Sequence, residues 1–171
     1  QLEGVLIIAM KLSIIIPVYN GAATIGTLVS QLFDKLSGIY GLEVVLVNDC
    51  SPDDDSAEVC RALAAQRDEV VFLDLARNFG EHNAVMAGLN PCTGDCAVIM
   101  DDDFQNPPAD VIKLVDELGR GYDVVYSAYT NKKHHYFRNI ASRFNGWVAS
   151  ILIKQPGGLY LSSHKAINRF L

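Results

Sequence analysis

Three consecutive carboxylates carry the clearest chemistry in this 171-residue sequence. Asp101, Asp102 and Asp103 follow an apolar run in the segment VIMDDDFQNPP. Carboxylates this close together repel one another and raise each other's pKa unless a cation neutralises them. If the strand geometry persists through them, Asp101 and Asp103 face one way and Asp102 faces the other. Gln105, two residues further along, would add a neutral oxygen.

Oxygen ligands without cysteine or histidine suit Mg²⁺ or Mn²⁺. Mg²⁺ commonly keeps water ligands and bridges one or two carboxylates to a diphosphate. The three acids therefore look like half of a clamp for a metal and a diphosphate. An alternative stays open, because acids ahead of a proline-started helix also favour the positive end of its dipole without any ligand.

A second acidic run, NDCSPDDDSAEV, invites comparison with a calcium-binding loop. Counting from Asp49, the sixth position is Asp54, where such a loop needs glycine, and the twelfth is Cys60, where it needs glutamate. We interpret Asp53 to Asp55 as cap and first-turn charges of a helix, with Ser51 or Asp53 as its cap. Asp49 differs from them, because an acid at a strand end can accept from a nucleotide base or a ribose hydroxyl.

Apolar runs rich in β-branched residues alternate with stretches of helical period along the chain. Short strands that are buried on both faces and separated by helices predict an α/β fold with a parallel sheet and right-handed crossovers. The expected strands are 12–17, 43–48, 70–74, 95–101 and 122–127. The expected helices are 22–36, 54–66, 82–89 and 109–118.

Polar clusters follow four of these strands. They read PVYNG, NDCS, LARNFG and DDDFQ. Ligands of open parallel sheets bind beyond the carboxyl ends of the strands, so these clusters should share one edge and form the active site. Glycine-rich phosphate loops of either standard spacing and the G-x-S-x-G esterase motif do not occur in the sequence.

Charge is distributed unevenly along the chain. Residues 1–123 carry a net charge of −13 and residues 124–171 a net charge of +7. The basic third either meets an anion, such as phosphate or a membrane surface, or is a solvated face. Within it, an apolar stripe from Phe137 to Ile151 predicts a helix. No apolar run reaches the roughly 20 residues of a membrane span.

Two further features concern the ends of the chain and its cysteines. Residues 1–9 are interpreted as leader residues outside the fold, and residues 10–171 as one domain. Four cysteines without paired C-x-x-C spacing predict reduced thiols in a cytosolic setting.

Taken in order, several motifs resemble the family 2 glycosyltransferases of GT-A fold. Among that family, the chain is most similar to the polyprenyl-phosphate glycosyltransferases. The likeness runs from Leu12 to Leu171, and it depends most on RNFG and on a D-x-D-x-Q pattern before PP. The motifs are LSIIIPVYNGAATIGTLV, EVVLVNDCSPDDDS, LARNFGEHNAVMAGL, GDCAVIMDDDFQNPPADV and YDVVYS.

This resemblance implies a three-layer α/β/α domain that carries out an inverting, metal-dependent sugar transfer. The donor would be a UDP- or GDP-linked sugar, the acceptor a polyprenyl phosphate, and the metal Mg²⁺ or Mn²⁺. Asp101 and Asp103 would be the catalytic pair, and with Gln105 they would hold the metal. Arg138 and Ser142 would bind the acceptor phosphate. The donor nucleotide would meet Pro17, Tyr19, Asn20, Asp49, Arg77, Asp101 and Asp102.

The resemblance also implies a setting and shows two departures. Action at the inner face of the cell membrane is expected through segments beyond this chain, with a possible homo-oligomer and no nucleic-acid partner. Gly21 stands where the family usually has an acid after P-x-Y-N, which weakens an expected ribose contact. Gly158, Leu159 and Tyr160 stand near a segment often read as acid-Phe-Arg-Leu. The chain also ends before further family segments, so we expect it to be partial.

Two other functions remain open at this stage. A family 2 enzyme with a sugar or other hydroxyl acceptor would need a general base within roughly 3 Å of that hydroxyl. An ionised lipid phosphate needs none. A non-catalytic Mg²⁺-binding module of receiver type would need a lysine at the end of a late strand, and no predicted strand ends in lysine.

Overall fold

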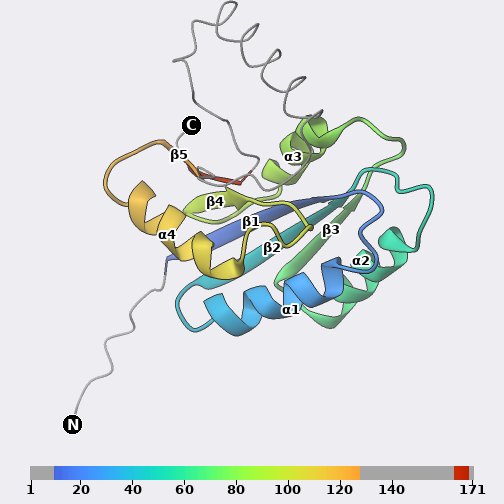
Figure 1. Ribbon diagram of the computed structural model, residues 1–171, viewed down its shortest axis with the longest axis horizontal. Coiled ribbons are helices and arrows are strands. Elements are labelled where there is room, and N and C mark those ends of the chain that lie inside the picture. Colours follow the sequence, from blue (N-terminus) through green and yellow to red (C-terminus); the bar gives the residue numbers. More distant parts are fainter. Residues whose placement is uncertain (1–9, 128–163, 170–171) are drawn as a thin grey trace, which may run out of the picture. The chain divides into compact units, whose positions relative to one another are not determined.

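A computed structural model of the chain describes residues 10–127 and 164–169. Strands and helices alternate along most of this part of the chain, as Figure 1 shows. The strands are β1 (Lys11–Val18), β2 (Gly41–Asn48), β3 (Val70–Asp74), β4 (Cys96–Ile99), β5 (Val124–Tyr126) and β6 (Lys165–Asn168). The helices are α1 (Ile25–Leu36), α2 (Ser56–Gln66), α3 (Glu81–Leu89) and α4 (Pro108–Leu118).

The described strands form one sheet in the order β3-β2-β1-β4-β6-β5. Strands β3, β2, β1 and β4 are parallel, with Ile15 paired to Val45 on one side and to Ile99 on the other. Strand β6 runs antiparallel to β4, with Ala166 opposite Val98. The predicted α/β class is therefore confirmed as a mixed sheet, whereas β6 was not predicted.

The alternation of side chains along the central strands divides the core between the two faces of the sheet. Ile14 and Ile16 of β1 belong to the larger cluster, which α1 and α4 cover with Leu28, Leu32 and other residues. Ile15 of β1 belongs to a smaller cluster on the α3 face. All three isoleucines are completely buried, so the sheet is covered on both faces, as its continuous apolar strands predict.

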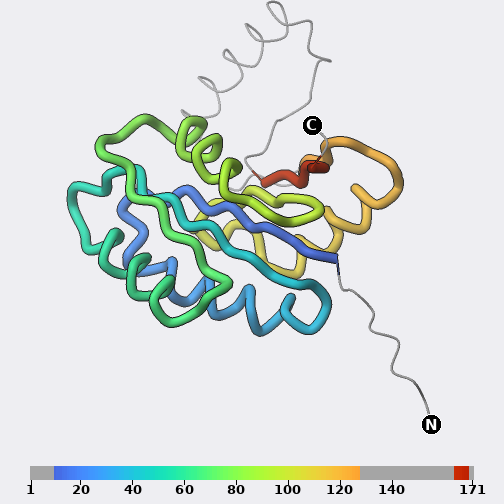
Figure 2. The backbone as a smooth tube through the Cα atoms, turned by 180° about the vertical axis from the view of Figure 1, so that it is seen from behind, coloured from blue at the N-terminus to red at the C-terminus, as the bar shows by residue number. Residues whose placement is uncertain are grey.

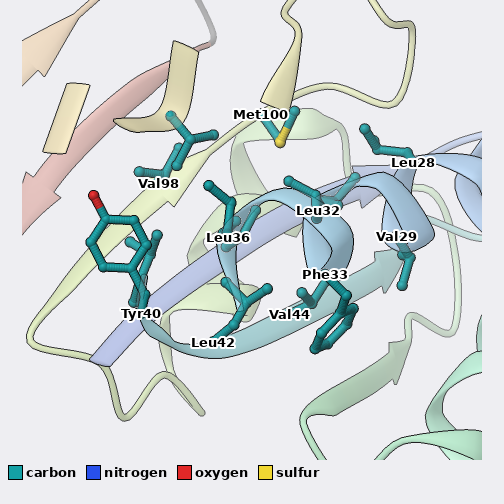
Figure 3. Close-up of a cluster of buried hydrophobic side chains, with 14 of the residues drawn as sticks. Leu28, Val29, Leu32, Phe33, Leu36, Tyr40, Leu42, Val44, Val98 and Met100 are labelled. Carbon is teal, nitrogen blue, oxygen red and sulfur yellow. The ribbon is translucent and has the colours of Figure 1, made fainter. Parts of the chain in front are cut away.

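Helix α1 contributes one apolar face to the larger core cluster. Its buried residues recur at three- and four-residue steps, and Figure 3 shows Leu28, Leu32 and Leu36 pointing towards the sheet.

Seen from behind in Figure 2, the chain passes repeatedly between strand and helix through short loops. Those loops bring the ends of distant segments to one edge.

By its internal contacts the chain divides into two units, one of Gln1–Val125 with Ser163–Leu171 and the other of Tyr126–Ser162. The expected leader at 1–9, the apolar stripe from Phe137 to Ile151, and Arg138 and Ser142 lie outside the described residues. Within 10–127 and 164–169, no helix is both long enough and apolar enough to cross a membrane.

Candidate active site

A cavity of about 330 Å³ opens at the carboxyl ends of β1, β2 and β4. The position is the switch point of the sheet, because the chain leaves β1 towards β2 on one side and adds β4 on the other. Open α/β sheets bind their ligands at such a point. The lining residues are Pro17, Val18, Tyr19, Asp49, Asn78, Gly80, Glu81, Asp101, Asp102 and Asp103.

Six residues that the sequence singled out lie together around this cavity: Pro17, Tyr19, Asp49, Asp101, Asp102 and Asp103. Asn20, Arg77 and Gln105 are not among the residues that line it. Their roles in donor or metal binding stay predictions, as do those of Arg138 and Ser142. The structure adds four lining residues. Val18, Asn78 and Gly80 belong to the clusters PVYNG and LARNFG but had no individual role assigned, and Glu81 lies outside the predicted clusters.

The three acids after β4 lie on a turn, so the premise of persisting strand geometry was wrong. The strand predicted for 95–101 spans only Cys96–Ile99, and Phe104 has a positive φ of 57°. The backbone N–H of Gln105 donates to Asp103 Oδ1 at 3.0 Å, which closes a local turn. Because the chain turns here, Asp101, Asp102 and Asp103 all border the cavity, and Gln105 does not.

Negative charge accumulates in this cavity. Five of its lining residues are carboxylates, and none of the lining residues in the described part is Lys or Arg. Burial, together with the neighbouring charges of Asp103 and Asp101, raises the pKa of Asp102 to about 6. Its Oδ2 atom is buried and has no hydrogen-bond partner among the described residues. The site therefore favours a cationic ligand.

Asp49 holds the loop that follows β3. It is only 4% exposed, and its two carboxylate oxygens accept the backbone N–H groups of Phe79 at 2.7 Å and Gly80 at 2.8 Å. Gly80 has a φ of 87°, which a residue with a side chain would adopt only under strain. The Arg77 guanidinium lies over the Phe79 ring, with its Cζ atom 4.7 Å from the ring centroid. The RNFG segment is thus docked on Asp49 beside the cavity.

A chain of hydrogen bonds fixes the loop after β1. Asn48 donates its side-chain N–H to Asp74 at 2.8 Å and accepts from the Ser51 hydroxyl at 2.6 Å. The Ser51 hydroxyl oxygen then accepts the backbone N–H of Asn20 at 2.9 Å. Asn20 has a φ of 55°, and its side-chain amide donates to Asp53 Oδ2 at 3.1 Å, whereas Asn20 does not line the cavity. Its contribution is to shape the loop that carries Tyr19.

The start of α2 differs from the predicted cap. The residue at the cap position is Asp55, without a side-chain cap bond, and neither Ser51 nor Asp53 has that place. Asp54 instead accepts the backbone N–H groups of Ser56 at 3.0 Å and Ala22 at 2.9 Å. The acidic run thus joins the start of α2 to the loop after β1, which explains why it contains more acids than a helix cap needs.

The residues around the cavity fit a divalent cation bound together with a ligand. No group of three or more His, Cys, Asp or Glu within residues 10–127 and 164–169 is arranged to hold a metal by itself. Asp101 and Asp103 nevertheless supply hard oxygen atoms, and the excess of carboxylates requires a counter-charge. This is the donor set that suits Mg²⁺ or Mn²⁺ shared between one or two carboxylates and phosphate oxygens.

The fold and the cavity define an α/β protein with an acid-lined site at the switch point of its sheet. The sequence model described as glycosyl transferase family 2 matches residues 13–168. The chain belongs to this family.

Two curated proteins show which members of the family the chain resembles. The chain is 39% identical over 136 residues to an undecaprenyl-phosphate 4-deoxy-4-formamido-L-arabinose transferase of Sodalis glossinidius, covering 78% of this chain and 41% of that protein. A protein of the same name from Aeromonas hydrophila is 34% identical over 160 residues, covering 92% of this chain and 47% of that protein. The chain therefore spans less than half the length of these relatives.

Solved structures share the fold at lower identity. A glucosyl-3-phosphoglycerate synthase from Mycobacterium tuberculosis, in complex with Mn²⁺, UDP and phosphoglyceric acid, has a TM-score of 0.71 and 22% identity, covering 94% of this chain and 56% of that one. A mannosyltransferase from Pyrobaculum calidifontis, in complex with GDP-Man and Mn²⁺, has a TM-score of 0.67 and 19% identity, covering 94% and 45%. These similarities establish the GT-A fold.

Proposed function

We propose that this chain is the donor-binding part of an enzyme that transfers a sugar from a nucleoside diphosphate to a polyprenyl phosphate. The observation that carries the proposal is the acid-lined cavity at the switch point of a family 2 fold. The names of the curated relatives supply the acceptor class. The chain spans less than half of those proteins, so the activity is proposed for the intact enzyme.

The donor nucleotide would lie between the loops after β1 and β2. Tyr19 is about half exposed at the rim and offers an aromatic face to a base, while Pro17 borders the cavity beside it. Asp49 would face the base, but both its oxygens already accept backbone N–H groups, so one lone pair on each remains for a ligand. We therefore assign Asp49 first to shaping the nucleotide site and second to contacting the base.

The diphosphate would lie against the turn after β4. Asp103 is exposed and Asp101 is half-buried, so both are placed to share a divalent cation with phosphate oxygens. Mg²⁺ or Mn²⁺ bound there would supply Lewis-acid stabilisation of the charge that develops on the leaving nucleoside diphosphate. Asp101 and Asp103 hold that position through their place on the turn, which the Gln105 N–H bond to Asp103 closes.

The acceptor side of the reaction needs few residues from this part of the chain. A lipid phosphate is already ionised at neutral pH, so its oxygen can attack the anomeric carbon without a general base. Arg138 and Ser142 remain our proposal for the groups that bind this phosphate. We also place the reaction at the inner face of the membrane, where a basic segment would meet an anionic surface.

Transfer is tested with the intact protein, labelled UDP- or GDP-sugars, undecaprenyl phosphate and Mn²⁺. We expect label to pass into the lipid fraction. Label found only in water-soluble product would refute the lipid acceptor and favour a hydroxyl acceptor. Absence of any transfer with every donor, despite a folded protein, would refute the enzymatic proposal.

Donor binding is tested separately by calorimetry with UDP in the presence and absence of Mn²⁺. Asp103→Ala removes an exposed carboxylate of the clamp, and we expect it to weaken Mn²⁺-dependent UDP binding at least about tenfold, or about 1.4 kcal/mol. Asp116→Ala is the matched control, because it removes the same charge from an exposed position on α4 away from the cavity. Equal UDP affinities for the two variants would contradict the clamp.

A further inference from the structure

Gly21 directly follows the loop residues that border the cavity, and its missing side chain is occupied by another residue. A Cβ atom added at Gly21 would lie 1.8 Å from Asp102 Oδ2 and 3.0 Å from Asp102 Cγ. The carboxylate of Asp102, from the turn after β4, thus fills the place that a side chain at position 21 would take. The two loops are complementary at this point, with a large group on one and none on the other.

The backbone at Gly21 is held too firmly to move aside. Its N–H donates to the buried Ser56 hydroxyl at 2.8 Å, and its carbonyl accepts the N–H groups of Thr24 and Ile25 at 3.0 Å each. Its φ is not positive, so a residue with a side chain meets no backbone strain there. An alanine at position 21 would therefore act on its neighbours by the steric contact of its Cβ atom.

Asp102 is the neighbour that must give way. Val18 Cγ1 lies 3.1 Å from the added Cβ, but Val18 is completely buried in the core. Asp102 instead also lines the cavity, so its carboxylate has open space to turn into. There it would join Asp101 and Asp103 and place a third negative charge beside the diphosphate.

We propose that Gly21 is a positioning residue of the donor site, which keeps the Asp102 carboxylate turned out of the cavity between the loop after β1 and the turn after β4. Of the three acids on the turn after β4, Asp101 and Asp103 would then be the two that hold a metal and a diphosphate bound in the cavity. The binding consequence rests on the proposed function, whereas the contact between Gly21 and Asp102 does not.

The test is a double-mutant cycle of Gly21→Ala and Asp102→Ala, made in the full chain. UDP affinity is measured in Mn²⁺, and the unfolding midpoint is measured without ligand. We expect Gly21→Ala alone to weaken UDP binding at least about tenfold and to lower the midpoint. In the Asp102→Ala background the same change should alter UDP affinity less than about twofold, because the carboxylate that it displaces is absent.

Two variants separate steric contact from other effects. Gly21→Ala with Asp102→Asn should keep the lowered midpoint, because asparagine fills the same volume as aspartate. Gly26→Ala is the matched glycine control, since nothing lies within 4 Å of a Cβ added there in α1. It should leave UDP affinity unchanged.

Each outcome bears on one claim. An effect of Gly21→Ala that is equal in both Asp102 backgrounds, or is absent, overturns the inference, and so does failure of both Gly21 variants to fold. Folding of the double variant where Gly21→Ala alone fails supports it. If the wild-type chain binds no UDP, the proposed function fails instead, and the unfolding midpoints still decide whether the two residues oppose each other.

Discussion

Glu43 allows a test of whether the hydrogen bonds that stabilise the sheet can be broken without changing the site cavity. It lies near the start of β2, at the end of the sheet opposite the cavity, and is 7% exposed. Its carboxylate accepts the Ser13 hydroxyl at 2.6 Å, the Thr93 N–H at 2.9 Å and the Thr93 hydroxyl at 2.6 Å. The Lys11 ammonium lies 3.5 Å away. One side chain thus connects β1, β2 and the segment before β4.

The magnitude follows from these contacts. Glu43→Ala leaves three donors without their acceptor, and removing one partner from a buried charged network costs about 3–5 kcal/mol. For a chain of this size that corresponds to a fall in Tm of about 10 °C. Glu43→Gln keeps the volume and one acceptor oxygen, so we expect a smaller loss of about 1–3 kcal/mol. Urea unfolding at pH 7 measures both losses.

The pH dependence of this loss has a definite sign. Burial acts to raise the Glu43 pKa, but hydrogen bonds from Ser13 and Thr93 and the Lys11 charge lower it below 4.5 overall. A lowered folded pKa contributes stability that is present above pH 4.5 and is lost as the pH falls through the folded pKa. The difference in unfolding free energy between wild type and Glu43→Gln should therefore shrink on acidification.

The control is Glu58→Gln, which removes an exposed carboxylate 3.9 Å from Arg61 and should change stability by no more than about 0.5 kcal/mol. UDP affinity of folded Glu43→Gln should equal that of wild type, because residue 43 does not line the site cavity. A loss below about 1 kcal/mol for Glu43→Ala, or a Gln difference that grows towards low pH, would refute the reasoning.

Three more outcomes are expected. Gly88→Ala should lose about 1–3 kcal/mol of unfolding free energy in urea, since its Cβ would lie 2.6 Å from Ile15 Cγ2. Asp102→Asn should raise the metal-free unfolding midpoint at pH 7.5. The Asp102 pKa is raised from 3.8 to about 6, so the wild-type protein loses folding stability as the pH rises through that range. The gain from asparagine should therefore vanish below pH 3.8. Asp49→Asn should speed proteolysis of the loop before α3, because the backbone N–H groups of Phe79 and Gly80 in that loop lose their charged acceptor. An unchanged cleavage rate would contradict the role of Asp49 in holding the loop.

The periodicity of the sequence was enough to predict the central sheet. Its four parallel strands are largely apolar and alternate with stretches of helical period, so the positions of these elements along the chain and their approximate bounds could be predicted, but not the order of the strands in the sheet. Strand β6 was not predicted, because Lys165–Asn168 is only four residues long and pairs with a strand about 70 positions earlier. Nothing local in KAIN distinguishes it from a loop.

The candidate site was predictable as a location but not in its details. Parallel strands place their carboxyl ends at one edge, so Asp49 and Asp101 had to come together. Gln105 does not line the cavity, because the chain turns after Asp103 at Phe104, whose positive φ no sequence pattern announces, and its role in metal binding stays a prediction. Gly80 had a signal in the sequence, because it ends the cluster LARNFG and a glycine directly before a helix often marks a turn.

The carboxylates of the cavity also explain why so much of the surrounding loop structure is polar. Five acids around one cavity repel each other, and that repulsion would open the loops unless other contacts held them. Asp49 is satisfied by two backbone N–H groups, and the loop after β1 is anchored by Ser51 and Ser56. At the turn after β4, by contrast, the Asp102 Oδ2 atom is buried without a hydrogen-bond partner among the described residues, beside a second carboxylate, Asp103, that accepts the Gln105 N–H. A bound cation would relieve the repulsion at that turn. Binding of metal and nucleotide should therefore raise the unfolding free energy of the protein as well as fill the cavity.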